Sequence, residues 1–314
     1  MLRITPSEEY VQKLLATPRE GEEKILAFYE HRLGLICQNA RLMLMPLDDH
    51  MAHRGDGVFE SIKAEKNRIY QLPEHLKRLE SSAAAMKLIL PCARHELQSI
   101  ILQVAAAGGQ SDCMLRVLVG RGPGGFGIDP AECPNASLYV VAYKFTPKGA
   151  SFFEKGLTAF KSSIPARAAT VAKIKNTNYQ SGVAMIEEAK QRGLDVALAF
   201  DEDGFLAEGA IANVCLVDEK NRLIVPEFSH ALPGTTILRL MELAAAEMPV
   251  LTQKVRQEDV LKAKELLLTG TTVDCVAITS FEGAPIGQGK RGPLAMRLKA
   301  LLDHDLRENG LPFQ

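Results

Sequence analysis

One stretch of the 314-residue chain, residues 144–168, separates two halves that differ in their sequence patterns. Its prolines and glycines lie at Pro147, Gly149, Gly156 and Pro165. Such residues interrupt helices and strands and are common where two domains join. A chain of this length is long enough to build two hydrophobic cores. We therefore predict two domains, with their connection in this stretch.

The first half mixes helical and strand patterns. A capped start at residues 6–9 and apolar residues at helical spacing over 22–32 predict a helical N-terminal extension, residues 1–40. Residues 42–70 turn strand-like, and residues 58–64 roughly alternate apolar and polar side chains. Further helices are predicted at 73–88 and 94–107, and strands at 114–119 and 138–143. Residues 41–147 are therefore predicted to form a small α/β domain.

The second half, residues 148–314, is predicted to be the larger domain. Its expected strands cover residues 157–163, 196–201, 211–217, 265–268 and 275–278, and its expected helices cover 178–192, 234–248, 257–264 and 293–306. A hairpin turn is predicted at residues 201–204. The overall fold class is therefore α+β.

Composition excludes several classes of protein. The charged fraction is 24% and the formal net charge is −1, so no global field attracts nucleic acid or a membrane surface. The N-terminal residues lack a signal-peptide pattern, and no apolar run approaches the ~18 residues that span a bilayer. The six cysteines are scattered without a Cys-x-x-Cys pair, which predicts reduced thiols, no metal site and a cytoplasmic location.

Two polar residues of the second half are of types that work together in one kind of chemistry. Lys175 lies in the run 172–179, and Lys173 is a rival two positions earlier. Glu208 lies inside the apolar, small-residue strand pattern 205–214. A lysine that binds an aldehyde and an acid that keeps a pyridine nitrogen protonated indicate a pyridoxal phosphate site.

Three further segments offer groups for a phosphate. Residues 232–236, Leu-Pro-Gly-Thr-Thr, lead into a helical run, and the free amides of a helix N-terminus bind anions. Residues 268–272 end a strand in a glycine-threonine turn. Arg78 lies beside the apolar stripe of a predicted helix and is suited to a fork on a phosphate. Each segment also has an ordinary structural reading, as a helix cap, a turn or a solvated charge.

The order and spacing of these segments resemble one known family, the class IV aminotransferases, which are the fold-type IV pyridoxal phosphate enzymes. The motifs that carry the resemblance are Arg-Gly-Asp-Gly-Val-Phe-Glu at 54–60, Glu-His-Leu-x-Arg-Leu at 74–79, Lys-x-x-Asn-Tyr at 175–179, Glu-Gly-x-x-x-Asn-Val at 208–214, Leu-Pro-Gly-Thr-Thr at 232–236 and Thr-Gly-Thr-Thr at 269–272. The resemblance covers the chain from about residue 42 onward.

The resemblance implies a role for each matching residue. It makes Lys175 the catalytic lysine that holds pyridoxal 5'-phosphate, Tyr179 the donor to the phenolic oxygen and Glu208 the partner of the ring nitrogen. The phosphate would be held by Arg78, Thr235, Thr236 and Thr271. The substrate would contact Arg54, Phe59, Thr271 and Thr272. The implied fold has a small α/β N-terminal domain and a larger β-barrel-like domain with flanking helices, and the family usually forms homodimers.

The particular reaction is left with alternatives. The expected activity is ping-pong transfer between a small α-amino acid and a 2-oxo acid, with D-amino acids ahead of branched-chain L-amino acids. Residues 48–55 and the loop 120–127 are similar to the plant-type D-amino acid aminotransferases. The same loop also resembles that of aminodeoxychorismate lyases, which eliminate pyruvate, although Phe126 and Glu60 depart from that family's pattern. A non-catalytic cofactor-binding homologue is the alternative from another class.

Overall fold

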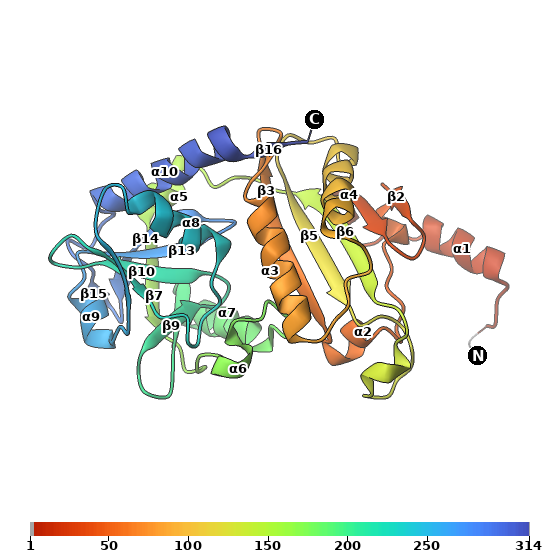
Figure 1. The fold of residues 1–314 in the computed structure, drawn as a ribbon, viewed down its shortest axis with the longest axis horizontal. Coiled ribbons are helices and arrows are strands. Elements are labelled where there is room, and N and C mark those ends of the chain that lie inside the picture. The colour runs from red at the N-terminus through yellow and green to blue at the C-terminus, as the bar shows by residue number, and fades with distance from the viewer. Residues whose placement is uncertain (1–2, 314) are drawn as a thin grey trace. The chain divides into compact units, whose positions relative to one another are not determined.

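The computed structural model describes residues 3–313 and divides the chain into two compact units. Unit 1 runs to Thr146 and takes in the chain again from Leu311, whereas unit 2 is Pro147–Gly310. The division lies at the start of the proline- and glycine-containing stretch. Figure 1 shows that each unit is a sheet with helices packed against it.

Unit 1 is built on one seven-stranded antiparallel sheet in the order β16-β4-β3-β5-β6-β1-β2. Its strands are β1 (Ile25–Glu30), β2 (Leu35–Cys37), β3 (Gly57–Glu65), β4 (Arg68–Ile69), β5 (Cys113–Gly120), β6 (Ser137–Lys144) and β16 (Leu311–Pro312). Its helices are α1 (Ser7–Ala16), α2 (His50–Arg54), α3 (Leu72–Ala85) and α4 (Arg94–Ala107), with short 3-10 turns at Glu22–Lys24, Ala40–Leu42 and Pro130–Glu132.

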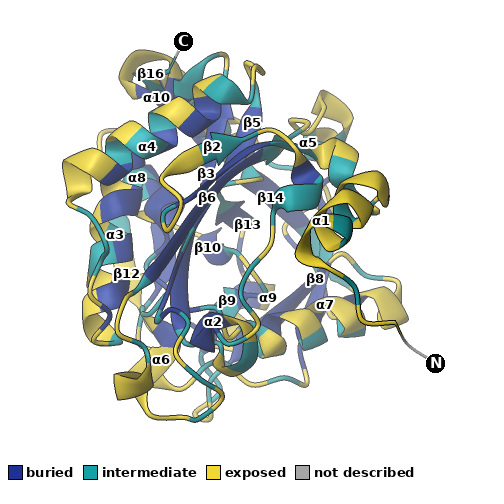
Figure 2. Ribbon diagram, turned by 90° about the vertical axis from the view of Figure 1, so that its right-hand side faces the viewer, coloured by how far each residue is buried: buried dark blue, intermediate teal, exposed yellow. Residues whose placement is uncertain are grey.

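Alternation along the strands decides which face of this sheet is covered. Val58, Ile62 and Ala64 of β3 are fully buried on one face, where α3 packs against the strand. Helix α3 contributes Leu72, Leu76 and Leu79, whose spacing places them on one side of a helix. Helix α4 packs against β1, β5 and β6. Figure 2 shows the strands as buried and the outer sides of these helices as exposed.

The expectation of a wholly helical N-terminal extension is wrong. Among residues 3–40 only α1 is a regular helix, and residues 25–30 form β1, which pairs with β6 through Phe28 opposite Val141 and Tyr29 opposite Val140. An apolar run such as residues 25–29 has no unambiguous period. Burial of its side chains between β6 and β2 makes it a strand, because β-sheet pairing also satisfies its backbone.

Unit 2 contains a nine-stranded sheet with the order β12-β11-β10-β13-β14-β7-β8-β9, and β15 pairs with β14. Its strands are β7 (Leu157–Lys161), β8 (Val196–Phe200), β9 (Leu206–Gly209), β10 (Asn213–Val217), β11 (Leu223–Pro226), β12 (Val250–Gln253), β13 (Glu265–Gly270), β14 (Asp274–Phe281) and β15 (Ala284–Pro285). Its helices are α5 (Ala150–Lys155), α6 (Ala169–Ala172), α7 (Gln180–Arg192), α8 (Thr235–Ala244), α9 (Gln257–Leu261) and α10 (Pro293–Asn309).

This sheet curls around one core, which confirms the β-barrel-like domain. Alternate residues of neighbouring strands point into a single apolar cluster that includes Leu157, Val196, Leu198, Phe200, Leu206, Val214, Leu216, Leu266, Leu268, Val276 and Ile278. The residues between them face outward, where α8 packs on β13 and α10 packs on β14. The amide of Gly209 donates to the carbonyl of Ala212 and so ties β9 to the start of β10.

The hairpin expected at residues 201–204 is confirmed. Strands β8 and β9 pair antiparallel on either side of it, the amide of Asp201 donates to the carbonyl of Phe205, and Gly204 has a φ of 81°, in the left-handed region. This turn delivers the chain into β9, the strand that carries Glu208.

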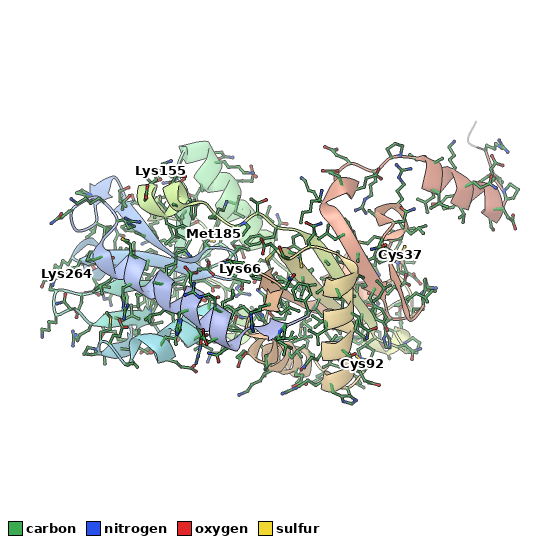
Figure 3. The ribbon with its side chains drawn as sticks, turned by 90° about the horizontal axis from the view of Figure 1, so that it is seen from above. Cys37, Lys66, Cys92, Lys155, Met185 and Lys264 are labelled. Carbon is green, nitrogen blue, oxygen red and sulfur yellow. The ribbon has the colours of Figure 1, made fainter. Side chains whose placement is uncertain are left out.

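All six cysteines carry free thiols. Cys37 and Cys92, labelled in Figure 3, belong to unit 1. Cys215 is buried within unit 2, and burial raises the pKa of its thiol to about 12, so it stays protonated. Among residues 3–313 no helix is both long and apolar enough to cross a membrane.

Candidate active site

Lys175 lies between α6 and α7 in unit 2, with its amine beside Tyr179. Its Nζ donates to the hydroxyl of Tyr179 over 3.3 Å, and the same nitrogen lies 5.5 Å from the centre of the tyrosine ring. The four-residue spacing and the start of α7 at Gln180 bring the two side chains together. Lys173 is exposed, whereas Lys175 is half-buried. Of the two lysines, Lys175 is therefore the one whose burial suits a residue that holds a cofactor.

Glu208 of β9 presents its carboxylate to this region. Oε1 accepts a hydrogen bond from Nη2 of Arg167 over 3.0 Å, and Oε2 accepts one from the amide of Leu232 over 3.0 Å. Burial raises the pKa of the Glu208 carboxyl, while the charge of Arg167 and the Leu232 amide act in the opposite direction. Burial therefore favours the protonated acid, whereas Arg167 favours the carboxylate.

Arg167 is a residue of this site that the sequence patterns did not single out. It lies between β7 and α6, in the stretch predicted only as a domain connection. Its Cζ lies 5.7 Å from the centre of the Tyr179 ring, within the range of a cation–π contact. Its partner Glu208 is 41 residues away in the chain, so no short-range pattern connects the two. In the local sequence, Arg167 is marked only by its place in the connecting stretch, two residues after Pro165.

The start of α8 is fixed against the same strand pair. Thr235 and Thr236 are buried in its first turn. Asn213 of β10 donates from Nδ2 to the carbonyl of Leu232 over 2.7 Å. The amide of that leucine contacts Glu208. One short loop therefore links the acid to the amides and hydroxyls of a helix N-terminus, an arrangement that binds phosphate groups.

We expect Gly234→Ala to weaken this loop. A Cβ at position 234 would lie 2.1 Å from Oδ1 of Asn213, so the amide side chain must move and lose its bond to Leu232. The expected cost is roughly 1–3 kcal/mol of unfolding free energy, together with weaker cofactor binding. Urea titration and equilibrium dialysis of the cofactor measure the two effects. Gly149→Ala is the matched control, because Gly149 also precedes a helix and an added Cβ there meets nothing within 4 Å.

The glycine-threonine turn lies beside the same elements of unit 2. Strand β13 pairs with β10 through Thr269 opposite Asn213, and the turn closes with the amide of Val273 donating to the carbonyl of Gly270 over 3.1 Å. Residues 209–212 and the turn residues Gly270, Thr272 and Val273 line one cavity of about 340 Å³. Thr271 is half-buried and Thr272 is exposed. The turn therefore follows directly on the strand that adjoins Asn213.

Arg78, the phosphate residue expected from unit 1, grips a buried acid. Its Nε and Nη2 donate to the two oxygens of Glu60 over 2.8 and 2.7 Å, and Nδ1 of His75 lies 2.7 Å from the same carboxylate. Although burial favours the neutral acid, the charges and hydrogen bonds of Arg78 and His75 lower the pKa of Glu60 to about 2. The signal for Glu60 was present in the sequence, because it shares one face of the strand pattern with the apolar residues Val58 and Ile62.

Arg54, the substrate candidate of unit 1, and two further arginines, Arg116 and Arg121, have distinct surroundings. Arg54 donates to the carbonyls of His53, Phe126 and Gly127, so it braces the loop that follows β5. Arg121 forms a two-pronged pair with Asp56.

Arg116 extends over the ring of Phe59, with its Cζ 4.8 Å from the ring centre. Among residues 3–313 no hydrogen bond or ion pair involves the Arg116 guanidinium. Of the three arginines, Arg116 is therefore the one with donors available in this structure.

The residues of unit 2 fit pyridoxal phosphate. The amine and the phenol come from one segment, and the acid and the helix N-terminus come from two others. Gly234 has no side chain that would displace Asn213 from its place beside the loop. Together these groups supply one partner for each polar group of that cofactor. Within the described part of the chain, no group of three His, Cys, Asp or Glu side chains is arranged to hold a metal ion.

Comparison with known proteins defines the class. The family model for amino-transferase class IV matches residues 57–281. The chain is 33% identical to the chloroplastic D-amino-acid transaminase of Arabidopsis thaliana over 294 residues, which cover 91% of this chain and 78% of that protein. It is 27% identical to the branched-chain-amino-acid aminotransferase of Escherichia coli K12, over 80% of this chain and 84% of the relative.

A solved structure of an aminotransferase has a similar fold. The T.th. branched-chain amino acid aminotransferase with pyridoxamine 5'-phosphate matches with a TM-score of 0.85 and 27% identity, covering 90% of this chain and 94% of that one. The fold and the family model define a pyridoxal phosphate-dependent aminotransferase. The chain belongs to the class IV aminotransferases.

Proposed function

We propose that this enzyme moves an amino group between a small α-amino acid and a 2-oxo acid by a ping-pong mechanism, with D-amino acids as the preferred donors. The observation that carries the proposal is the cluster of Lys175, Tyr179 and Glu208 in unit 2, with Lys175 Nζ 3.3 Å from the tyrosine hydroxyl. A binding protein has no need for such a lysine together with a buried acid.

In this proposal each residue has a defined role. Lys175 carries the cofactor, and its freed amine takes the α-proton of the substrate and later returns a proton. Tyr179 donates to the phenolic oxygen, and Glu208 holds the proton of the ring nitrogen. When bound, the cofactor supplies an electron sink for the carbanion. Thr235, Thr236 and the turn at Thr271 would bind its phosphate.

The residues of unit 1 enter as proposals from the sequence. Arg78 would add a guanidinium to the phosphate, and its fork on Glu60 would hold the group in one direction. Phe59 would contact the substrate. Thr272 of unit 2 would offer its backbone amide to a substrate carboxylate. Arg54 is a weaker candidate for that carboxylate, because its donors already bind loop carbonyls.

The preference for D-amino acids is supported by the name of one relative, the chloroplastic D-amino-acid transaminase, and by the similarity of residues 48–55 to the plant-type group. Branched-chain L-amino acids are the second candidate, supported by the similarity to the branched-chain amino acid aminotransferases of Escherichia coli and T.th.. A solved complex of the T.th. enzyme contains N-(5'-phosphopyridoxyl)-L-glutamate, so glutamate belongs in any substrate panel.

A half-reaction screen tests this function. The cofactor-loaded protein is mixed with D-alanine, D-glutamate, L-leucine, L-glutamate or aminodeoxychorismate, and the visible absorbance of the cofactor is followed. We expect the D-amino acids to convert the cofactor faster than the L-amino acids. A faster reaction with L-leucine would move the assignment to the branched-chain group. Release of pyruvate from aminodeoxychorismate without an acceptor would identify lyase chemistry.

Two further expectations from the sequence accompany the function as predictions. One is a homodimer, which light scattering coupled to size-exclusion chromatography measures. The other is a cytoplasmic location with no nucleic-acid or membrane partner.

A further inference from the structure

Arg167 touches three parts of the proposed cofactor site at once. Its Nη2 donates to Oε1 of Glu208 and to the carbonyl of Ala172, over 3.0 and 2.8 Å, and its Nη1 donates to the carbonyl of Ile174 over 3.3 Å. The two carbonyls belong to the short segment that leads to Lys175. One guanidinium therefore fixes the acid and the lysine loop relative to each other within unit 2.

The backbone around Arg167 is held as well. Nδ1 of His230 lies 3.0 Å from the Arg167 carbonyl, and His230 precedes the loop whose Leu232 amide binds the other oxygen of Glu208. The guanidinium stacks over the ring of Tyr179. The charged or titratable groups around the acid are thus Arg167 itself, Lys175, Tyr179 and His230.

This geometry has a chemical consequence for an acid paired with a pyridine nitrogen. The two groups share one proton, which is either on the nitrogen, leaving a carboxylate, or on the acid, leaving a neutral ring. In a largely buried site the neutral pair is favoured, because burial penalises charges. A guanidinium bonded to the carboxylate stabilises its charged form and opposes that preference. Only the proton moves between the two arrangements.

Building on the proposed function, we propose that Arg167 is a positioning residue that holds Glu208 as a carboxylate and so places the shared proton on the ring nitrogen of the cofactor. The Leu232 amide assists by occupying the second oxygen. Arg167 does not touch the reacting atoms in this scheme. It sets the electron demand of the ring through Glu208, and its contact with the loop before Lys175 couples that setting to the position of the lysine.

The test reads the proton directly. Pyridoxal phosphate labelled with ¹⁵N in its ring is bound to the wild type, to Arg167→Met and to Arg167→Lys. The chemical shift of the ring nitrogen is then recorded by NMR from about pH 6 to about pH 9. We expect a protonated nitrogen in the wild type, a shift toward neutral pyridine in Arg167→Met, and recovery toward the wild-type value in Arg167→Lys. The half-reaction with an amino donor should slow at least about tenfold in Arg167→Met, the factor that one pKa unit represents.

Arg192→Met is the matched control. Arg192 also pairs with a glutamate, Glu188, over 2.9 Å and also lies over an aromatic ring, that of Phe160, but on the far end of α7. In Arg192→Met the chemical shift of the cofactor's ring nitrogen should equal that of the wild type. A wild-type shift in Arg167→Met would overturn the inference while leaving the aminotransferase assignment intact. Failure of the wild type to bind the cofactor would instead contradict the proposed function.

A second measurement covers the case in which Arg167→Met does not fold. In the cofactor-loaded wild type, the side-chain ¹⁵N signals of Arg167 are compared with those of Glu208→Gln, which keeps the shape of the acid and removes its charge. We expect the Arg167 signals to move and the ring nitrogen to lose its proton together. Unchanged Arg167 signals would show that the arginine does not act through the acid, and the inference would be discarded.

Discussion

Lys175→Ala is expected to abolish amino-group transfer, because the residue proposed to carry the cofactor and to move the substrate proton is lost. Removing a nucleophile that also acts as the base removes the covalent step and the proton transfer together. The visible absorbance of the lysine-bound cofactor should disappear, and the reaction with any amino donor should fall to background. Absorbance spectra after dialysis and single-turnover kinetics with a donor amino acid measure both.

Lys173→Ala is the control within the same loop. Lys173 is exposed and lies two residues before the catalytic candidate, so its removal changes the local charge by the same amount. The variant should bind the cofactor and react like the wild type. If Lys175→Ala kept the absorbance and Lys173→Ala lost it, the two assignments would be exchanged.

Glu60→Gln is expected to destabilise the protein by about 3–5 kcal/mol at neutral pH. The carboxylate is fully buried and receives two hydrogen bonds from Arg78 and one from His75. Replacing it by a neutral amide leaves the cation of Arg78 without its counter-charge, and breaking one side of a buried pair has a cost of this order. Cofactor affinity should fall as well, if Arg78 binds the phosphate.

The pH dependence of this effect follows from the pKa of Glu60. The folded protein lowers that pKa from 4.5 to about 2, so the unfolded chain takes up a proton at a higher pH than the folded one. The stabilisation is complete above about pH 4.5 and is lost as the pH falls toward 2. A depression of this size corresponds to about 3 kcal/mol. As the pH falls from about 5 to about 3, the difference in unfolding free energy between the wild type and Glu60→Gln should therefore become smaller.

Urea unfolding at several pH values measures this difference, and Glu80→Gln is the matched control. Glu80 also receives two hydrogen bonds from one arginine, Arg94, but both side chains are substantially exposed. Exposed pairs of this kind contribute about 0–1 kcal/mol. Equal losses in the two variants would contradict a special role for the buried pair.

Much of the fold could be predicted from the sequence because its longer elements carry clear periods. The helix at Arg94–Ala107 and the core strands of both units follow the expected patterns. The pattern of residues 22–32 predicts a helix where the structure has β1, since a short apolar run has no decisive period. Strands of two residues, such as β4 and β16, are too short for any periodic signal, and only their pairing partners define them.

The residues of the site divide in the same way. Lys175, Tyr179 and the start of α8 stand in local motifs whose spacing already suggests their proximity. Arg167 could not be assigned, because its importance comes from a partner 41 residues away in the chain. Glu60 stands out as an acid on an apolar strand face, but its pairing with Arg78 is defined only by the fold. Arg54 was proposed for the substrate from its neighbours in sequence, whereas its donors are turned toward the carbonyls of a nearby loop. Donor direction is a property of the folded chain alone.

The short strand β16 has a consequence for how the protein acquires its structure. Leu311 and Pro312 complete the sheet of unit 1 beside β4, although the rest of that sheet ends at Lys144. During synthesis on the ribosome, all of unit 2 emerges before this last pairing can form. The edge of β4 in unit 1 therefore stays unpaired while some 160 residues are translated. An unpaired strand edge of a nascent chain is a site that a chaperone can protect.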